Sequence, residues 1–560
     1  MKKLHLFLAA CIVSGNSWAQ IALDVRTADL SANGKSDKAR FVGARRAEGE
    51  IKMTFSTQSC EVNDLGSILE FEGTNYNFEH LVFDDQLRFK RLDKESVLGM
   101  GKALAIAPVL GRNVEIKEGF GYWPGAGREG AWLDEYKYYP KIYASAGGKT
   151  AGPGCLERLE AKKTGGKIPF AGEGYLYSST SAEGIITLTY SSANGTEAVK
   201  AMCRLYAPDG AKKKEVSFDI PYKNFAARFL KIARKDGVND HIMILQPTTG
   251  WNKYGVKVAE TRTEPLAFEY FRIDGTTLEV KERFTFNALN SQWLVEQAVE
   301  NNGTLYLMGQ SSAKTKLTGY AYGNFPTSEG GNFQNSVRID ELENYQVMRV
   351  QNGKLAGINV ITPDDMEKVQ QSVPGTKGSN SPSGYFRLQE IRFVNGNMYV
   401  TGQNTSPGKE ADDRKQVFMM VLNEEARPQR LFYVPKSNYS NSNMFLSADG
   451  KTIYWAIYDY SEFDVTAMRK EPTQIKMGFV MGGDDHVITN KKHNDDGPML
   501  QLVKIDLQNN TASELQKCGE GDYTLLDECP VLYSNSQEVM FLGISGGKKE
   551  RVSKFIKLKL

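Results

Sequence analysis

The sequence contains few histidines, few cysteines and no apolar run long enough to cross a membrane. Its 560 residues include five His and six Cys. No Cys-x-x-Cys spacing occurs, so a zinc ribbon or a thioredoxin-like site has no support. No segment approaches the roughly 20 consecutive apolar residues that a transmembrane helix needs. We therefore predict a chain without a transmembrane segment and without these cysteine-based sites.

The sequence also lacks an excess of charge of either sign, with 69 Lys and Arg against 67 Asp and Glu. A balanced charge gives no broad positive field to attract polyanions, which argues against nucleic acid and anionic membrane surfaces as partners. Apolar residues make up 41% of the chain, which is too high a fraction for a disordered protein. The sequence predicts a folded protein with a large core.

The amino terminus has the layout of a secretory signal peptide. Two lysines precede an apolar run at Leu4–Val13, and Ser17 and Ala19 supply the small residues that a signal peptidase reads. We predict that residues 1–19 are removed and that the mature protein is periplasmic or secreted. A lipid anchor at Cys11 remains the alternative, although the apolar run before it is short.

The other cysteines permit disulfides in an exported protein. They are Cys60, Cys155, Cys203, Cys518 and Cys529. Cys518 and Cys529 bracket a short polar connection, which makes them the best candidate pair. An odd number leaves one thiol over, and the remaining pairing is open.

Short alternating apolar stretches recur along the chain, and helical periodicity is almost absent. Gly303–Gln310 and Gly396–Gln403 match at glycine, tyrosine, glycine and glutamine. Ser447–Trp455 and Tyr533–Phe541 share the same layout of a strand, a tight polar turn and a second strand. A second unit, a strand, a turn and a charged strand, alternates with the first. Together the two units predict an all-β chain of repeated four-stranded antiparallel sheets.

The segment from Ser447 to Lys451, followed by Ile453, Tyr454 and Trp455, resembles the repeat of WD40-like β-propellers of the TolB type. The resemblance implies that residues 20–560 form one propeller of about seven four-stranded blades. The blades are expected near 40–92, 160–220, 222–286, 288–362, 385–434, 440–516 and 528–560. The number could be six or eight, because the insertion at 93–158, between the first two blades, could contain a further blade. Two smaller β domains are the alternative.

The last blade ends after its third strand, so the ring needs another strand to close. We expect Ile21–Leu30 to supply it by pairing with Ser553–Leu560, which would leave no free edge. Long connections fall between second and third strands and between blades, and propeller geometry places both kinds on one face. Loops on a rigid scaffold commonly carry binding function, so we expect the functional site on that face. Neutral insertions at loop tips are the alternative.

Most catalytic and cofactor motifs fail on their context. Gly543–Gly547 has the G-x-S-x-G spacing of a nucleophile elbow, but no histidine follows it. Gly125–Gly130 has the G-x-G-x-x-G spacing without the preceding apolar strand of a dinucleotide site. Asp364 and Asp365 are better explained by helix capping than by acid–base catalysis. We therefore predict no catalytic residue and no cofactor.

Two clusters remain as candidate sites. Four residues in the connection 461–498 could bind a divalent transition metal, because imidazole and carboxylate are suitable ligands. They are Asp484, His486, His493 and Asp495. A solvated acidic loop is the alternative. Aromatic residues in the insertion 93–158 could contact a protein or a sugar ring, or could form a small core beneath the loop. They include Tyr122, Trp123, Trp132 and Tyr136.

These observations favour a non-catalytic binding or scaffold protein of the periplasm. We expect it to dock another envelope protein, associated with the outer membrane, as an accessory or plug subunit of a secretion or assembly machine. This expectation rests on analogy with the fold. The alternative is a carbohydrate- or peptide-active hydrolase with its site in the central funnel of the propeller.

Overall fold

The structure of this chain is a computed structural model. The described residues are 21–30, 40–47, 49–56, 60–62, 67–71, 75–98, 104–105, 117–121, 139–143, 145–146, 149–150, 173–181, 184–192, 199–206, 212–221, 225–234, 238–247, 251–252, 255–256, 267–290, 292–313, 323–326, 332–335, 343–376, 385–405, 414–435, 440–459, 498–519, 522–526, 530–545 and 552–560. They form an all-β structure of mainly antiparallel sheets. The predicted fold class is confirmed at this level.

Seven sheets of four or more strands lie within these ranges, and we number them in chain order. Sheet 1 contains β2 (Arg40–Ala47), β3 (Glu50–Ser56), β6 (Asn75–Asp84) and β7 (Phe89–Leu98). Sheet 2 contains β13 (Glu173–Ser181), β14 (Gly184–Ser192), β15 (Val199–Tyr206) and β16 (Lys212–Ile220). Sheet 3 contains β17 (Phe225–Ala233), β18 (Asn239–Pro247), β21 (Ala267–Ile273) and β22 (Val280–Asn287).

The second half of the chain continues the same order. Sheet 4 contains β23 (Gln292–Asn301), β24 (Thr304–Ser312), β27 (Asn344–Gln351) and β28 (Lys354–Ile361). Sheet 5 contains β30 (Tyr385–Val394), β31 (Asn397–Thr405), β32 (Arg414–Leu422) and β33 (Pro428–Pro435). Sheet 6 contains β34 (Ser440–Leu446), β35 (Thr452–Asp459), β36 (Met499–Asp506), β37 (Thr511–Ala512) and β38 (Gln516–Cys518). Sheet 7 contains β39 (Thr524–Leu525), β40 (Val531–Ser534), β41 (Glu538–Ser545), β42 (Val552–Lys559) and β1 (Leu23–Asp29).

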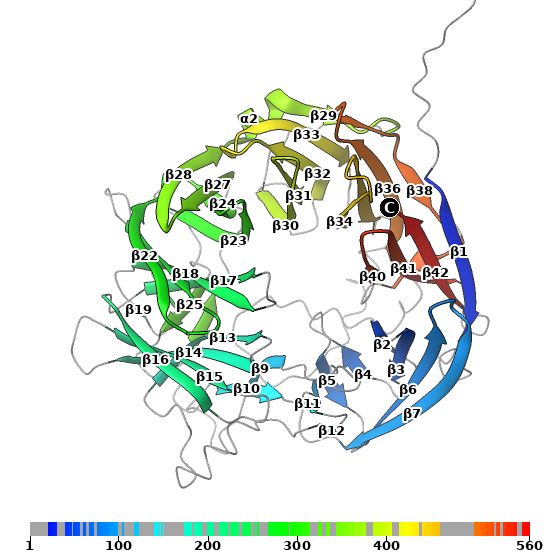
Figure 1. Cartoon of the computed structure of the whole chain (residues 1–560), viewed down its shortest axis with the longest axis horizontal. Coiled ribbons are helices and arrows are strands. Elements are labelled where there is room, and N and C mark those ends of the chain that lie inside the picture. Colours follow the sequence, from blue (N-terminus) through cyan, green and yellow to red (C-terminus); the bar gives the residue numbers. More distant parts are fainter. Residues whose placement is uncertain are drawn as a thin grey trace, which may run out of the picture.

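The sheets follow one another around a common centre (Figure 1). In sheets 1 to 5 the four main strands are adjacent in chain order. The first strand of these sheets lies toward the centre in the view, and the fourth lies at the outside. We call β2, β13, β17, β23, β30 and β34 the inner strands, because they occupy this central position.

The two ends of the folded chain meet in sheet 7. Strand β1 pairs antiparallel with β42 from Leu23 opposite Leu558 to Asp29 opposite Val552, as Figure 1 shows in blue and red. The predicted pairing of the N-terminal and C-terminal strands is confirmed. Pairing β1 gives the outer edge of β42 a hydrogen-bonding partner, so that β42 is not an exposed edge strand.

Apolar side chains fill the spaces between neighbouring sheets. Six buried clusters lie between sheets 2 and 3, 3 and 4, 4 and 5, 5 and 6, 6 and 7, and 7 and 1. Successive side chains of a strand point to opposite faces of its sheet, so the second and third strands carry apolar residues on both faces. One face packs against the preceding sheet and the other against the following sheet. Each fully buried Leu, Ile or Phe side chain contributes about 1.5–3 kcal/mol.

Asn-Gly turns join several strand pairs. Asn352 and Gly353, between β27 and β28, have φ values of 51° and 68°. Asn395 and Gly396, between β30 and β31, have values of 51° and 80°. Two consecutive positive φ angles are the requirement of a type I′ turn, which matches the twist of a hairpin. The structure confirms the turn expected at Asn352-Gly353.

Short elements are added to this framework. Helix α2 (Pro363–Val369) begins with a capping box in which Thr362 and Asp365 bond each other, so the capping role expected there is confirmed at Asp365. Strand β29 (Gln370–Ser372) then pairs parallel with β33. Strands β25 (Gly323–Pro326) and β26 (Asn332–Asn335) form a hairpin that extends sheet 3 beyond β17. Small pairs or ladders complete the list: β4 (Cys60–Val62) with β5 (Ser67–Phe71) and β8 (Leu104–Ala105), β9 (Lys117–Gly121) with β10 (Tyr139–Tyr143), β11 (Ser145–Ala146) with β12 (Lys149–Thr150), and β19 (Trp251–Asn252) with β20 (Gly255–Val256).

No helix within the ranges given above has the length and apolar character to span a membrane.

Candidate functional site on the inner strands

A β-bulge in β23 places a carboxylate beside the centre of the ring. The register with β24 shifts between Val295 and Gln297, so Glu296 is the extra residue of the bulge. Gly309 lies opposite Val295. A Cβ atom at Gly309 would overlap the carbonyl oxygen of Leu294 and lie 2.7 Å from the Cα atom of Val295. The second glycine of the sequence repeat therefore lets the two backbones approach at the bulge.

The next sheet repeats this arrangement. The register between β30 and β31 shifts between Leu388 and Glu390, which makes Gln389 the extra residue. Gly402, the corresponding glycine of the second repeat, lies opposite Leu388. Register shifts also occur in β2, β13 and β40. Bulges re-aim side chains and are common beside active sites, so the polar bulge residues of β23 and β30 are the first candidates for function.

Glu296 has a defined polar environment. The Nε2 atom of Gln310 donates a hydrogen bond of 2.9 Å to Oε1 of Glu296. Tyr345 pairs with Gln310 across the sheet and is fully buried. Burial, and in second place the negative charge of Glu296, raises the pKa of Tyr345 well above its ordinary value. Tyr345 therefore stays protonated beside the carboxylate at neutral pH.

Buried polar side chains, mostly amides and hydroxyls and one carboxylate, continue across sheets 4, 5 and 6. They lie where the second strand ends and the third begins, at the points where the long connections leave the sheets. We call this set the polar layer, and it comprises Gln310, Ser311, Ser312, Asn344, Gln346, Gln403, Asn404, Gln416, Asp459 and Gln501. All are buried. A layer of this kind separates the apolar core from the end of the sheets that carries the long connections.

Several polar atoms of this layer have no hydrogen-bond partner among the described residues. They are Oε1 of Gln310, Nε2 of Gln346, and both Nε2 and Oε1 of Gln416. The backbone N–H of Gln416 donates to Oδ1 of Asn404 at 2.7 Å, so only its side-chain amide is unsatisfied. Buried polar groups are rarely left without partners, because each costs about 1–3 kcal/mol. These amides favour a molecule that can both donate and accept hydrogen bonds.

Polar contacts also connect the inner strands of sheets 4, 5 and 6. Gln297 donates from Nε2 to the carbonyl oxygen of Gln389 at 3.2 Å. The hydroxyl of Ser442 donates to Oε1 of Gln389 at 2.7 Å. Glu390 accepts from the backbone N–H of Met444 at 2.7 Å. The bulge in β30 therefore joins β23 on one side and β34 on the other.

Glu390 is surrounded by donors. Its Oε1 atom accepts from Nη2 of Arg392 at 2.9 Å, and this pair is partly exposed. Its Oε2 atom accepts from Met444 and, at 3.5 Å, from Nδ2 of Asn443. Charge-assisted bonds of this kind fix the position of the carboxylate. Glu296 and Glu390 thus occupy neighbouring inner strands in different environments, one beside a buried tyrosine and one beside an arginine.

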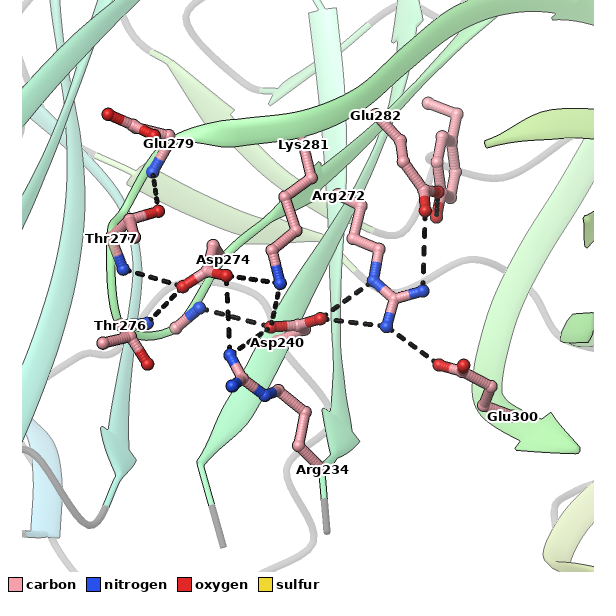
Figure 2. A network of polar contacts seen from close by, with 12 residues as sticks. Arg234, Asp240, Arg272, Asp274, Thr276, Thr277, Glu279, Lys281, Glu282 and Glu300 are labelled. Carbon is pink, nitrogen blue, oxygen red and sulfur yellow. Dashed lines mark hydrogen bonds and ion pairs between the residues drawn. The ribbon is translucent and has the colours of Figure 1, made fainter. Parts of the chain in front are cut away.

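A cluster of charged side chains lies in sheet 3, at the end where β17 turns into β18 and β21 turns into β22 (Figure 2). Asp240 is buried and accepts from Arg272 at 2.9 Å, with Arg234 at 3.6 Å and Lys281 at 3.5 Å. Asp274 forms ion pairs with Lys281 and Arg234. Figure 2 shows these side chains directed toward one another from the ends of β17, β18, β21 and β22.

This cluster holds the turns of sheet 3 together and connects them to sheet 4. Arg272 forms an ion pair of 2.8 Å with Glu300 at the far end of β23. The backbone N–H groups of Thr276 and Thr277 donate to Oδ1 of Asp274, each at 2.7 Å. Burial alone would raise the pKa of Asp274, but its bonds to Lys281 and to these N–H groups lower it to about 2. Because every cation shown has a carboxylate partner, we assign the cluster a structural role.

The candidate sites predicted from the sequence lie outside this arrangement. The aromatic residues Tyr122, Trp123, Trp132 and Tyr136 and the metal candidates Asp484, His486, His493 and Asp495 fall outside the described residues. Within the described part of the chain, no group of three or more His, Cys, Asp and Glu residues could hold a metal ion.

The predicted disulfide is only partly visible. Cys518 is buried as a free thiol in the structure, and Cys529 falls outside the described ranges. Burial raises the pKa of Cys518 to about 12. The pairing with Cys529 stays a prediction.

The sequence analysis did not single out Glu296 and Glu390, and the prediction that the chain has no catalytic residue stays a prediction. A signal for them was present in the sequence. In each repeat, the strand before the Gly-x-x-Tyr-x-x-Gly-Gln segment contains two consecutive polar residues, Glu296-Gln297 and Gln389-Glu390, where an alternating strand would have one.

Neither a protein-family model nor a curated protein matches this chain. Solved structures of apocarotenoid oxygenase from Synechocystis are similar to it. One variant of that enzyme is 12% identical, with a TM-score of 0.34 and coverage of 90% of this chain and 94% of that chain. A cobalt-substituted form is also 12% identical, with a TM-score of 0.34 and coverage of 89% and 94%. A chimera of the oxygenase and RPE65 is 11% identical, with a TM-score of 0.35 and coverage of 97% and 94%.

These similar structures are enzymes, and they contradict the prediction of a non-catalytic scaffold. We withdraw that prediction. A likeness at this TM-score assigns neither a substrate nor a reaction to this chain. The association with an outer-membrane partner stays an untested expectation.

Proposed function

We propose that the protein is a carbohydrate-active hydrolase that cleaves glycosidic bonds at the polar layer of sheets 4, 5 and 6. The observation that carries this proposal is the position of Glu296. It stands on a bulge of an inner strand, hydrogen-bonded to Gln310 and beside the buried Tyr345. Glu390 lies next to the corresponding bulge of the neighbouring inner strand. Glycoside hydrolysis commonly uses two carboxylates that flank the scissile bond, and these two residues stand on the inner strands of neighbouring sheets.

The environments of the two carboxylates suggest different roles. Glu296, next to a buried apolar and tyrosine environment, is suited to exchange a proton with the leaving-group oxygen as general acid and then with water as general base. Glu390, held in position by Arg392 and a backbone N–H, is suited to stabilise or attack the positively charged sugar carbon. Gln310 would hold Glu296 in position, and Tyr345 would supply a neutral hydroxyl nearby.

The composition of the polar layer favours a sugar over a charged ligand. Gln310, Gln346 and Gln416 offer uncharged donors and acceptors that have no partner within the described ranges. Sugar hydroxyls both donate and accept, so they match such amides without bringing a net charge. A site of this kind also rejects ligands that leave its buried amides unpaired. We therefore propose a neutral oligosaccharide as the substrate class.

We further propose that residues 20–560 form a single β-propeller exported after removal of residues 1–19. The circular order of seven sheets and the pairing of β1 with β42 support the propeller. The charged and apolar pattern of the first residues supports export. An exported hydrolase would meet its oligosaccharides outside the cytoplasm.

The test is to incubate the purified protein with a panel of neutral oligosaccharides and to measure newly formed reducing ends. We expect Glu296→Gln to lower the rate at least 100-fold, because general acid–base groups contribute about 10²–10⁴-fold. The matched control is Glu300→Gln, which removes a carboxylate from the far end of the same strand, and it should retain the rate. A panel that yields no cleavage, or equal rates for both variants, would overturn the proposal.

A second measurement separates the two carboxylates. Glu390→Gln should also lose activity, and its circular dichroism spectrum and thermal midpoint show whether sheets 5 and 6 stay joined. For Glu296→Ala, added azide should restore cleavage of a substrate with a good leaving group, because azide can replace water when the general base is absent. Rescue of the Glu390 variant instead of the Glu296 variant would reverse the assigned roles.

A further inference from the structure

The segment Ile21–Leu30, which we call the closing segment, is held by contacts at its two ends. The side chain of Gln516 bonds both backbone groups of Ile21. The N–H of Ile21 donates to Oε1 of Gln516 at 2.7 Å, and Nε2 of Gln516 donates to the carbonyl oxygen of Ile21 at 2.9 Å. A side-chain amide thus imitates one step of a β-ladder beyond the end of β1.

Two apolar side chains anchor the same segment. Ile21 is buried in the cluster between sheets 6 and 7, with Phe445 and Leu558 among its members. Leu30 is buried in the cluster between sheets 7 and 1, with Leu526 and Phe555 among its members. The closing segment therefore touches three sheets, although it contributes a strand to only one.

The part between these anchors is weakly specified by its sequence pattern. Five of the seven side chains of β1 are exposed, and one of them is the apolar Val25. Register is normally fixed by burial of every second side chain, and that information is nearly absent here. Within β1, Leu23 and Ala28 are partly buried against the same two clusters. The position of β1 is therefore set near its two ends, by these contacts and the Gln516 amide, together with backbone pairing to β42.

We propose that the seat of the closing segment is a recognition site for an extended peptide, and that the closing segment of a second copy of this chain can occupy it. The seat consists of the edge of β42, the amide of Gln516 and the two apolar clusters. A segment that buries few side chains along its length and is held at its ends can detach without loss of the sheet beneath it. Residues 31–39 connect it to β2, and a connection of that length spans about 30 Å when extended. Exchange between two copies makes the same contacts in trans, so it gives a strand-exchanged dimer.

The experiment uses two variants of the full chain, each with one added cysteine, Thr27→Cys and Lys554→Cys. These residues are partners in the ladder of β1 and β42, and the Lys554 ammonium donates to the Thr27 hydroxyl at 3.0 Å on the exposed face. Paired positions in antiparallel strands lie within disulfide range. After the variants are mixed at high concentration and oxidised, we expect a mixed dimer whose cross-linked peptides contain positions 27 and 554.

Three controls define the result. The double variant Thr27→Cys/Lys554→Cys should form the bond within one chain at low concentration. Thr27→Cys mixed with Lys557→Cys should give at least tenfold less mixed dimer, because Lys557 pairs with Asp24 and not with Thr27. Gln516→Ala in both chains should make exchange about tenfold faster, because it removes the side-chain bonds to Ile21.

The outcomes are decisive in both directions. A mixed dimer linked through positions 27 and 554 supports exchange. If the double variant closes its own bond and no mixed dimer appears at any concentration, the segment is not exchangeable and the proposal is wrong. If the double variant fails to form the bond, the seat itself is wrongly assigned. Neither result depends on hydrolase activity, so this test is independent of the proposed function.

Discussion

Substitution of Gly309 by alanine tests the connection between the sequence repeat, the bulge and the site. The added Cβ atom would overlap the carbonyl oxygen of Leu294 and lie within 2.7 Å of two further backbone atoms, the carbonyl carbon of Leu294 and the Cα atom of Val295. No side-chain rotation can relieve a clash between backbone groups. Strand β23 must move away from β24, or the bulge must rearrange. Overpacking of a close-packed region costs about 1–3 kcal/mol, and we expect about 3 kcal/mol here because backbone atoms must move.

Gly303→Ala is the matched control from the same repeat. Gly303 has a φ of 76°, and nothing lies within 4 Å of the position of an added Cβ atom. Alanine there loses only the conformational preference, about 1–2 kcal/mol. Urea titration followed by tryptophan fluorescence gives the two unfolding midpoints, and hydrogen exchange of the β23 and β24 peptides locates the change.

Hydrogen exchange of the β23 peptides gives the decisive comparison between the two variants. Exchange in β23 should rise in Gly309→Ala and stay near the wild-type value in Gly303→Ala. Glu296 stands on the same bulge, so Gly309→Ala should also lower hydrolytic activity. Equal stability of the two variants, or unchanged exchange in β23, would refute the role that we assign to Gly309.

Three further predictions concern buried ionisable groups. The pKa of Asp274 is lowered from 3.8 to about 2, so its carboxylate stabilises the wild type by about 2.5 kcal/mol above pH 4, and this stabilisation is lost as the pH falls toward 2. Asp274→Asn should remove this stabilisation. Unfolding titrations of both proteins between pH 2 and 7 measure the difference. Burial, and in second place the charge of Lys231, lowers the pKa of His241 to about 4. The free energy of unfolding of the wild type should therefore fall by up to about 3 kcal/mol between pH 6.5 and 4. A His241→Gln variant whose stability varies equally in that window would contradict this. Burial raises the pKa of Cys203 to about 12, so a thiol reagent at pH 7.5 should label it only after unfolding; rapid labelling of the native protein would show that the site is open.

The sequence predicts the repeated parts of the fold because their determinants are local. An Asn-Gly dipeptide such as Asn352-Gly353 fixes a hairpin turn through the φ angles of two residues. Alternating apolar residues fix the strand faces. The need for a partner along the last strand predicts the pairing of Ile21–Leu30 with the C-terminal strand, which the structure confirms.

The features that escaped prediction depend on contacts between segments far apart in the chain. The parallel pairing of β29 with β33 and the addition of β25 to sheet 3 have no marker in their own short sequences. The bulges at Glu296 and Gln389 have a local signal, a doubled polar residue, but their importance follows from the contacts that sheets 4, 5 and 6 make around them. Sequence reasoning placed function in the long connections and did not single out the polar layer, whose residues come together only in the folded sheets.

The most direct measurement is an experimental structure of the Glu296→Gln variant soaked with a neutral oligosaccharide that the wild type cleaves. The substitution removes the acid–base group and keeps the hydrogen bond to Gln310 possible, so the uncleaved sugar should stay bound. We predict a glycosidic oxygen within hydrogen-bond distance of residue 296, with Glu390 near the adjoining sugar carbon. A sugar bound away from sheets 4, 5 and 6, or none bound where cleavage occurs, would contradict the account.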